Sequence, residues 1–157
     1  KSMNRKTILV ALLAMASATA TYGQEIMSGG LVFSQSEDNT LSLVKSNDVA
    51  RIVVPATVEV GGERRVVSAV AGDAFYCSFN ISDIRLPEGV TQIGEEAFSQ
   101  CRALKSLHLA TTTPPQCSAG AFGGLHLEKI SLYVPVGSGA TYRADSVWGK
   151  FNVVEEK

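Results

Sequence analysis

A recurring pattern of apolar and polar positions divides most of this chain into short units. Each unit has a turn rich in glycine or alanine that ends in Ala-Phe, followed by a short apolar segment that usually ends in proline. The three phenylalanines are Phe75, Phe98 and Phe122, which lie 23 and 24 residues apart. A fixed period of this length is typical of stacked repeats, because one unit cannot bury its apolar face without a neighbour. The pattern therefore predicts a small solenoid.

Other positions repeat together with the phenylalanines. Five residues before each of them stands Val70, Ile93 or Cys117, and all three suit a buried ladder. Alternation in the apolar segments would direct their leucine, isoleucine and valine side chains inward and the residues between them outward. We predict that these segments form strands stacked in register, and they span residues 52–55, 84–86, 107–109 and 132–135.

The first repeat is longer than the others, and the extra residues predict a hairpin. Val58-Glu59-Val60 and Arg65-Val66-Val67 are short segments of strand-forming composition, and Gly61-Gly62 lies between them. Glycine pairs favour the positive backbone angles of tight hairpin turns. We interpret the hairpin as an insertion in one repeat and not as a separate domain.

Both ends of such an array need a cap, because otherwise an apolar face and an unpaired strand edge meet water. Residues 31–34 and 41–44 flank a polar turn, which predicts a β-hairpin at the first end. At the other end, residues 140–148 predict a short helix and residues 153–154 a last strand. The caps and the repeats together predict one continuous fold.

The strand Leu104-x-x-Leu107-x-Leu109, together with the segment Leu86 to Cys101, closely resembles the BspA-like (Treponema-type) leucine-rich repeats of bacterial surface proteins. The resemblance covers roughly residues 31–157, and the end of the chain is similar to the closing segment of Bacteroidetes members. It implies a β-dominated solenoid of short parallel strands and short helical turns, capped by an N-terminal β-hairpin and a C-terminal helix-strand segment. The family is functionally broad, so fold alone constrains activity weakly.

The N-terminal residues predict a secretion signal at residues 1–23. Met3 is its expected start, Arg5 and Lys6 form the charged region, and residues 8–16 form an apolar run. Nine apolar residues are too few to span a bilayer, which favours cleavage over a membrane anchor. Three cleavage positions remain open: after Ala18, after Ala20, or before Gln24.

The remaining residues, 24–157, are predicted to form one leucine-rich-repeat domain, with no room for a separate catalytic module. We divide it into an N-terminal β cap at 24–50, repeats at 51–135 and a C-terminal cap at 136–157. The whole chain has a formal net charge of −1 and a pI near 6.1. This balance gives no general attraction to nucleic acid or to anionic membranes, so neither is an expected partner.

All three cysteines follow the predicted signal, and an odd number leaves at least one thiol unpaired within a monomer. Cys117 occupies the ladder position of Val70 and Ile93, where it would act as a small buried hydrophobe. Cys77 and Cys101 lie one repeat apart but at positions that differ by one residue. A disulfide between them stays open, because it needs compatible Cβ directions.

No motif in the sequence indicates catalysis. His108 and His126 have no serine or cysteine beside them in a nucleophile pattern, and no paired Cys-x-x-Cys or His-x-x-x-His spacing points to a metal. We therefore expect a protein that is not an enzyme, with no catalytic residue, no metal and no cofactor.

Stacking in register would bring outward-facing side chains of neighbouring strands into a stripe. Arginine and tyrosine are enriched in protein-binding hot spots, so this stripe is the candidate binding site, and the alternative is a merely solvated sheet face. Its candidate residues are Arg51, Val53, Asp83, Arg85, His108 and Tyr133.

These features predict a secreted or cell-surface recognition or adhesion module. The family resemblance implies a protein partner, with host extracellular-matrix proteins such as fibronectin or fibrinogen as examples. The alternative is a carbohydrate-binding accessory protein, because aromatic rings offer flat apolar faces for sugars. Tyr133 or the C-terminal aromatics Tyr142 and Trp148 would supply those rings, unless the last two close the core instead.

Overall fold

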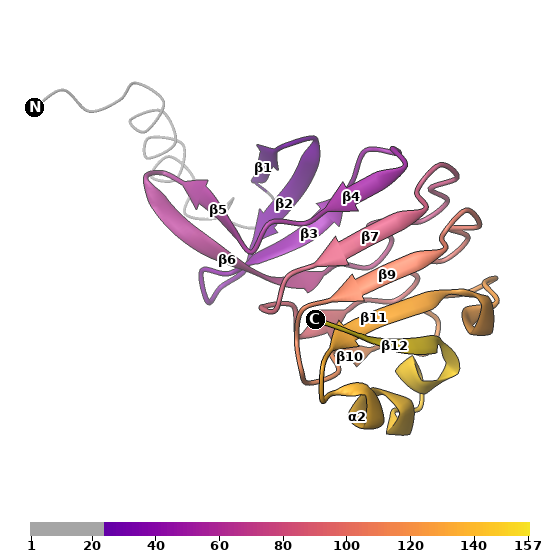
Figure 1. The fold of residues 1–157 in the computed structure, drawn as a ribbon. Helices are drawn as coiled ribbons and strands as arrows, with labels where there is room; N and C mark the ends of the chain where they lie inside the picture. The colour runs from indigo at the N-terminus through magenta and orange to yellow at the C-terminus, as the bar shows by residue number, and fades with distance from the viewer. Residues whose placement is uncertain (1–23) are drawn as a thin grey trace, which may run out of the picture.

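Two β-sheets make up most of the computed structural model, which describes residues 24–157 (Figure 1). The predicted signal peptide therefore lies outside the described residues. The front sheet has the strand order β12-β11-β9-β7-β4. Its strands are β4 (Arg51–Val53), β7 (Asp83–Leu86), β9 (Ser106–Leu109), β11 (Ser131–Pro135) and β12 (Asn152–Glu156).

The back sheet has the order β1-β2-β3-β6-β8-β10, and β5 pairs with β6 beside it. Its strands are β1 (Glu25–Ser28), β2 (Leu31–Gln35), β3 (Leu41–Lys45), β5 (Thr57–Val60), β6 (Glu63–Val70), β8 (Gln92–Ile93) and β10 (Gln116–Cys117). The predicted ladder is present in this sheet, because Ile93 pairs in register with Val70 on one side and with Cys117 on the other. Each repeat thus supplies one strand to each sheet, and the two-residue back strands were not predicted.

The front strands alternate between buried and outward positions, as the apolar pattern predicts. All pairs in this sheet are parallel, and Ile84, Leu107 and Leu132 are partners in neighbouring strands. Each of these three side chains is fully buried. The structure is thus a β-rich leucine-rich-repeat fold, which confirms the predicted fold class.

The Ala-Phe turns stack as closely as the strands do. The rings of Phe75 and Phe98 are parallel within 10° with centroids 5.0 Å apart, and those of Phe98 and Phe122 are parallel within 6° at the same distance. The backbone follows the same stacking, since the Phe75 N–H donates to the Ala97 carbonyl and the Phe98 N–H to the Ala121 carbonyl. The repeated phenylalanine is therefore a continuous internal ladder.

The turns themselves are tighter than the short helical turns that the sequence predicts. Backbone bonds join residues three apart, for example from Ala74 to Ala71, and no helix is assigned between residues 68 and 126. Positive φ angles interrupt the first turn at Asp73 and Cys77, the second at Glu96 and Gln100, and the third at Gly124. A left-handed residue cannot continue a right-handed helix, so the chain turns back toward the next strand.

Both predicted β-hairpins are present. β2 and β3 pair antiparallel, with β1 added as a third strand, and β3 then joins the parallel part of the back sheet through β6. β5 and β6 pair across the tight turn at Gly61 and Gly62, whose φ angles are 60° and 84°. Glycine adopts two such angles in succession at little steric cost, which fixes the register of the hairpin.

The C-terminal segment closes the core with aromatic side chains. A short 3-10 turn, η1 (Leu127–Lys129), precedes β11, and α2 (Gly139–Ala144) and a second 3-10 turn, η2 (Trp148–Lys150), follow it, so the helix ends earlier than predicted. The Tyr142 hydroxyl donates to the Thr111 carbonyl at 2.6 Å, and the Trp148 Nε1–H to the Pro115 carbonyl at 2.8 Å. Both rings are fully buried, which leaves no sugar platform there.

The three cysteines are free thiols. Cys101 is buried and its Sγ donates to the Phe75 carbonyl, whereas Cys77 occupies a left-handed turn position that corresponds to Gln100 in the next repeat. The two cysteines thus occupy different turn positions, and they form no disulfide. Burial raises the pKa of Cys101 to about 11 and that of Cys117 to about 12.

We expect only Cys77 to react with a thiol reagent in the native protein at pH 8. The thiolate is the reactive form, and a raised pKa keeps Cys101 and Cys117 protonated. Titration with Ellman's reagent should therefore detect one fast thiol in buffer and three in denaturant. Detection of one thiol in denaturant without reductant would instead indicate a bond between two cysteines.

Candidate functional site

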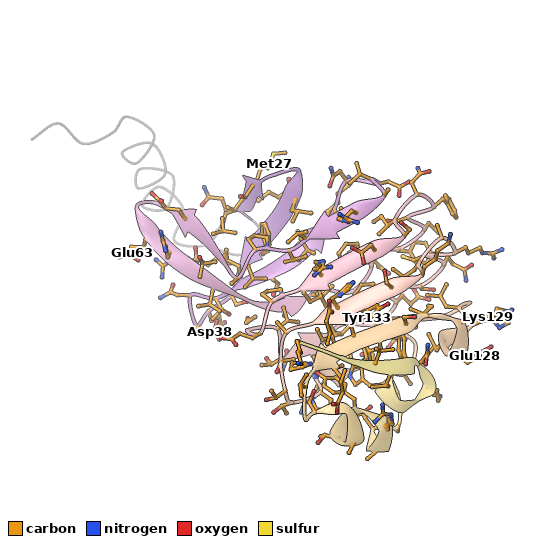
Figure 2. All side chains as sticks on the ribbon, in the orientation of Figure 1. Met27, Asp38, Glu63, Glu128, Lys129 and Tyr133 are labelled. Carbon is orange, nitrogen blue, oxygen red and sulfur yellow. The ribbon has the colours of Figure 1, made fainter. Side chains whose placement is uncertain are left out.

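The residues of the predicted stripe lie in register on neighbouring strands of the front sheet. Arg51, Asp83, Ser106 and Ser131 are partners along one row, and Val53, Arg85, His108 and Tyr133 along the next row. Tyr133 lies on β11 near the middle of this face (Figure 2). The structure thus brings all six candidate residues onto adjacent strands, and we call them, with Ser106 and Glu156, the strand face.

Asp83 is the centre of the polar contacts on the strand face, although its side chain is only 14% exposed. Its Oδ1 accepts a hydrogen bond from the Ser106 hydroxyl at 2.6 Å and lies 2.9 Å from His108 Nε2. Its Oδ2 lies 3.3 Å from Arg51 Nε and 3.9 Å from Arg85 Nε. One carboxylate therefore links side chains from three strands.

These contacts set the ionisation of Asp83. Burial alone would raise its pKa, but the hydrogen bond from Ser106 and the charges of His108 and Arg85 outweigh burial and hold the pKa below the ordinary value for aspartate. Asp83 is therefore ionised at neutral pH. An ionised carboxylate at this point orients His108 and attracts the two exposed arginines.

We expect Asp83→Asn to lower the free energy of unfolding at pH 7 by about 1.5 to 3 kcal/mol, the scale of a hydrogen bond to a charged group. Because the folded pKa of Asp83 is depressed, its contribution is complete above the unfolded value of about 3.9 and is lost as the pH falls through the folded value. Denaturant unfolding between pH 7 and pH 2 should thus show the difference between wild type and variant shrinking in acid. A constant difference would contradict this account.

His108 is less exposed than a residue on a solvated strand would be, with 14% of its side chain accessible. Its ring stacks on that of Tyr133 with centroids 4.5 Å apart, and its Nδ1 lies 2.9 Å from Glu156 Oε2. A neutral imidazole carries one N–H, so both carboxylate contacts are hydrogen bonds only when the ring is protonated. The ring joins β7, β9, β11 and β12 into a rigid base.

Ser106, His108 and Asp83 do not have the geometry of a hydrolytic triad. In such a triad the serine bonds to the histidine, which then removes its proton. Here the Ser106 hydroxyl donates to Asp83, and both ring nitrogens of His108 face carboxylates. The arrangement is therefore suited to fixing side chains on a surface and not to activating a nucleophile.

Three other side chains of the strand face project into solvent. The exposed fractions are 74% for Arg51, 48% for Arg85 and 59% for Val53. Exposed ion pairs contribute little to stability, so the two guanidinium groups remain free to bond a partner. A shallow hollow of about 470 Å³ lies beside them, lined in part by Val53, Arg85, Tyr133 and Glu156.

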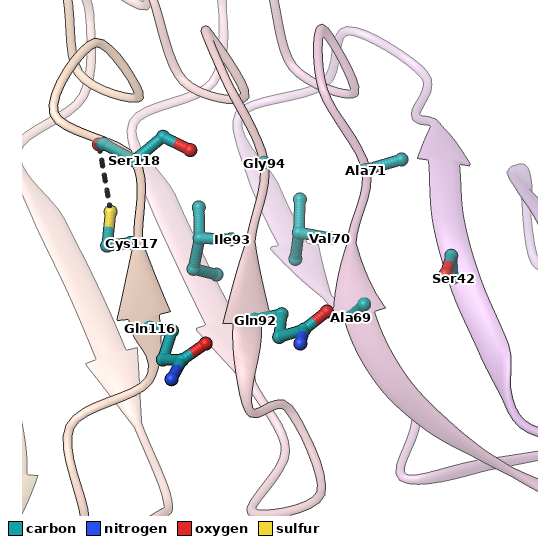
Figure 3. Close-up of a pocket in the computed structure, with 10 residues that line it drawn as sticks. All are labelled: Ser42, Ala69, Val70, Ala71, Gln92, Ile93, Gly94, Gln116, Cys117 and Ser118. Atoms are coloured by element: carbon teal, nitrogen blue, oxygen red, sulfur yellow. Dashed lines mark hydrogen bonds between the residues drawn. The ribbon is translucent and has the colours of Figure 1, made fainter.

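A second hollow, of about 500 Å³, lies on the back sheet (Figure 3). Its lining is uncharged: Gln92 and Gln116 stand side by side, and Val70, Ile93 and Cys117 form the row beside them. No charged or aromatic side chain lines it, so it offers less to bind a partner than the strand face does. It was not predicted from the sequence.

Among residues 24–157, no three histidine, cysteine, aspartate or glutamate side chains converge in a way that would hold a metal ion. The helices within the same residues are all too short to cross a membrane.

Stacked parallel strands with an inward leucine ladder and an outward polar stripe define a leucine-rich-repeat protein. Residues 68–141 match the family model described as "BspA type Leucine rich repeat region (6 copies)". Residues 68–141 therefore belong to the BspA-type leucine-rich-repeat family, which confirms the resemblance carried by Leu104-x-x-Leu107-x-Leu109 and the segment Leu86 to Cys101. No curated protein gives a match in sequence.

Solved structures of bacterial leucine-rich-repeat proteins have a similar fold. A leucine rich cell surface protein from Faecalibacterium prausnitzii A2-165 has 20% identity and a TM-score of 0.54 over 85% of this chain. A leucine-rich repeat protein from Bacteroides capillosus has 19% identity and a TM-score of 0.57 over 86% of this chain. The Leucine Rich Repeat protein of T. pallidum has 16% identity and a TM-score of 0.50 over 84% of this chain. The match spans 30%, 100% and 64% of those three chains, respectively.

Proposed function

We propose that this protein is a non-enzymatic recognition or adhesion module that binds another protein through the strand face. One observation carries the proposal: the exposed side chains of Arg51, Val53 and Arg85 surround a base that Asp83 and His108 hold rigid. Side chains fixed before binding lose less conformational freedom on binding. Arginine beside an apolar side chain is also typical of binding hot spots.

The proposed setting is the cell exterior. We propose that residues 1–23 direct export, are then removed, and leave residues 24–157 as one domain at the cell surface or in the medium. One of the structurally similar proteins is described as a leucine rich cell surface protein, which supports this setting. A host extracellular-matrix protein is the proposed class of partner.

A carbohydrate ligand has less support from the geometry. Tyr142 and Trp148 are buried in the core, and one face of the Tyr133 ring is covered by His108. Sugars stack on open aromatic faces. We therefore propose a protein partner and not a glycan.

The test is a parallel screen of residues 24–157 against immobilised matrix proteins and a glycan array. We expect binding to one or more proteins and none to glycans. Added salt should weaken this binding, because arginines make the contact. Binding to glycans alone, or to neither set, would overturn the proposal. Trp148 fluorescence should confirm that the sample is folded, so that a failure to bind cannot result from loss of structure.

A further inference from the structure

A hollow of about 350 Å³ lies on the side edge of the solenoid, between the loop before β9 and the segment that contains η1. We call it the edge pocket. It is lined by Arg102, Leu104, Leu125, His126, Lys129 and Ile130, with Gly124 completing it. None of these residues belongs to the strand face. Figure 2 shows Lys129 at the edge of the molecule, beside the beginning of β11.

The floor of the edge pocket is apolar and preformed. Leu104 and Ile130 are 6% and 3% exposed, and Leu125 is half-buried. Backbone bonds fix both buried positions, from Leu104 N–H to the Cys101 carbonyl and from Ile130 N–H to the Leu127 carbonyl, each at 3.0 Å. An aliphatic group that entered would meet a surface that needs no rearrangement.

The rim of the edge pocket is cationic, although the described chain is acidic. Residues 24–157 carry 15 aspartate and glutamate side chains against 11 lysine and arginine side chains. Arg102 and Lys129 are both exposed, and neither has a carboxylate oxygen within 4.0 Å among the described residues. The third basic group, His126, is 78% exposed and lies 3.6 Å from Glu128.

Arg102 is also oriented in advance. Its Nε and Nη2 donate to Gln100 Oε1 at 3.1 and 2.8 Å, so a neutral amide fixes the guanidinium without neutralising it. A guanidinium keeps further N–H donors for a planar anion such as a carboxylate. The hydrogen bonds from Arg102 to Gln100 distinguish the rim from a set of freely moving surface cations.

We propose that the edge pocket binds an acidic peptide segment of a partner protein, independently of the strand face. An aliphatic side chain of the segment packs on Leu104, Leu125 and Ile130, while carboxylates on either side of it bond Arg102 and Lys129. The aliphatic floor favours a peptide over a sulfated glycan, whose groups are polar throughout and would leave the floor unmatched.

The test uses the peptide acetyl-Glu-Glu-Leu-Glu-Glu-amide and two controls, in which all Glu are Gln or Leu is Ser. Binding to residues 24–157 is followed by amide chemical shifts at low salt. We expect shifts in residues 100–105 and 124–130 with the first peptide, and affinities lower by about tenfold for each control. No shift at millimolar peptide, or equal affinities for all three, would overturn the proposal.

Variants locate the contact. Arg102→Gln combined with Lys129→Gln should weaken binding by about tenfold or more, whereas Lys45→Gln, an exposed cation at the end of β3, should leave it unchanged. Equal effects of both variants, or tight binding of a heparin fragment in place of the peptide, would contradict the assignment. Arg85→Glu should not change peptide binding, so failure of the strand face and failure of the edge pocket remain distinguishable.

Discussion

Phe98→Ala is expected to lower the free energy of unfolding by about 3 to 5 kcal/mol, the cost of truncating a buried phenylalanine. Phe98 is fully buried and stacks on Phe75 at one face and on Phe122 at the other, with ring centroids 5.0 Å apart on both sides. The truncation thus removes two ring contacts at once and opens a cavity between neighbouring repeats. Denaturant unfolding of wild type and variant at pH 7 measures the difference.

Phe79→Ala is the matched control for this change. The same ring is removed, but Phe79 is 60% exposed and stacks on no other aromatic ring among residues 24–157. Its removal should change stability by no more than about 0.5 kcal/mol. Equal losses for Phe79→Ala and Phe98→Ala would mean that the phenylalanine ladder does not hold the repeats together.

Trp148→Ala should also destabilise the protein by about 3 to 5 kcal/mol, because this residue closes the open end of the ladder. Its ring meets Phe122 edge-on at 5.5 Å and stacks against Phe151 at 5.6 Å. Its Nε1–H bonds the Pro115 carbonyl, which the truncation leaves unsatisfied. The melting temperature and the unfolding free energy measure the loss.

Trp148→Phe separates the two contributions of the tryptophan. It keeps an aromatic ring in the cap and removes the hydrogen bond, so its loss of stability should be smaller than that of Trp148→Ala. If Trp148→Ala left the melting temperature unchanged and abolished sugar binding, the residue would be a ligand platform and the proposed role as a cap would be wrong.

The register of the strand face was predictable because it depends on two simple periods. Side chains alternate along a strand, and the repeat length fixes which residues become neighbours. Arg85 and His108 are 23 residues apart, and the structure pairs them as expected. The hairpin at Gly61-Gly62 was predictable for the same reason, since its turn chemistry is local.

The polar network of the strand face was not predictable in this way. His108 reaches Glu156, which lies 48 residues further along the chain and enters the site only because β12 adds to β11. No period in the sequence marks that strand. Alternation also predicts that His108 faces outward, but it cannot show that Asp83 and Tyr133 cover most of the ring.

The turns were predicted less well than the strands for a physical reason. Cys77 and Gln100 adopt positive φ at equivalent positions, where the third repeat has Gly124. Neither cysteine nor glutamine suggests a left-handed conformation on its own, because such residues rarely adopt it. Hydrogen bonds between neighbouring turns, such as Cys77 N–H to the Ser99 carbonyl, hold these residues in place.

The most direct test of the strand face is charge reversal of Arg85, measured against the protein partner that the screen identifies. Arg85→Glu should weaken the affinity for that partner by about tenfold or more, because it places a carboxylate beside Asp83 and removes an exposed guanidinium. Lys45→Glu makes the same charge change on the back sheet and should leave the affinity unchanged. Undiminished binding of a folded Arg85→Glu variant would show that the partner does not contact the strand face.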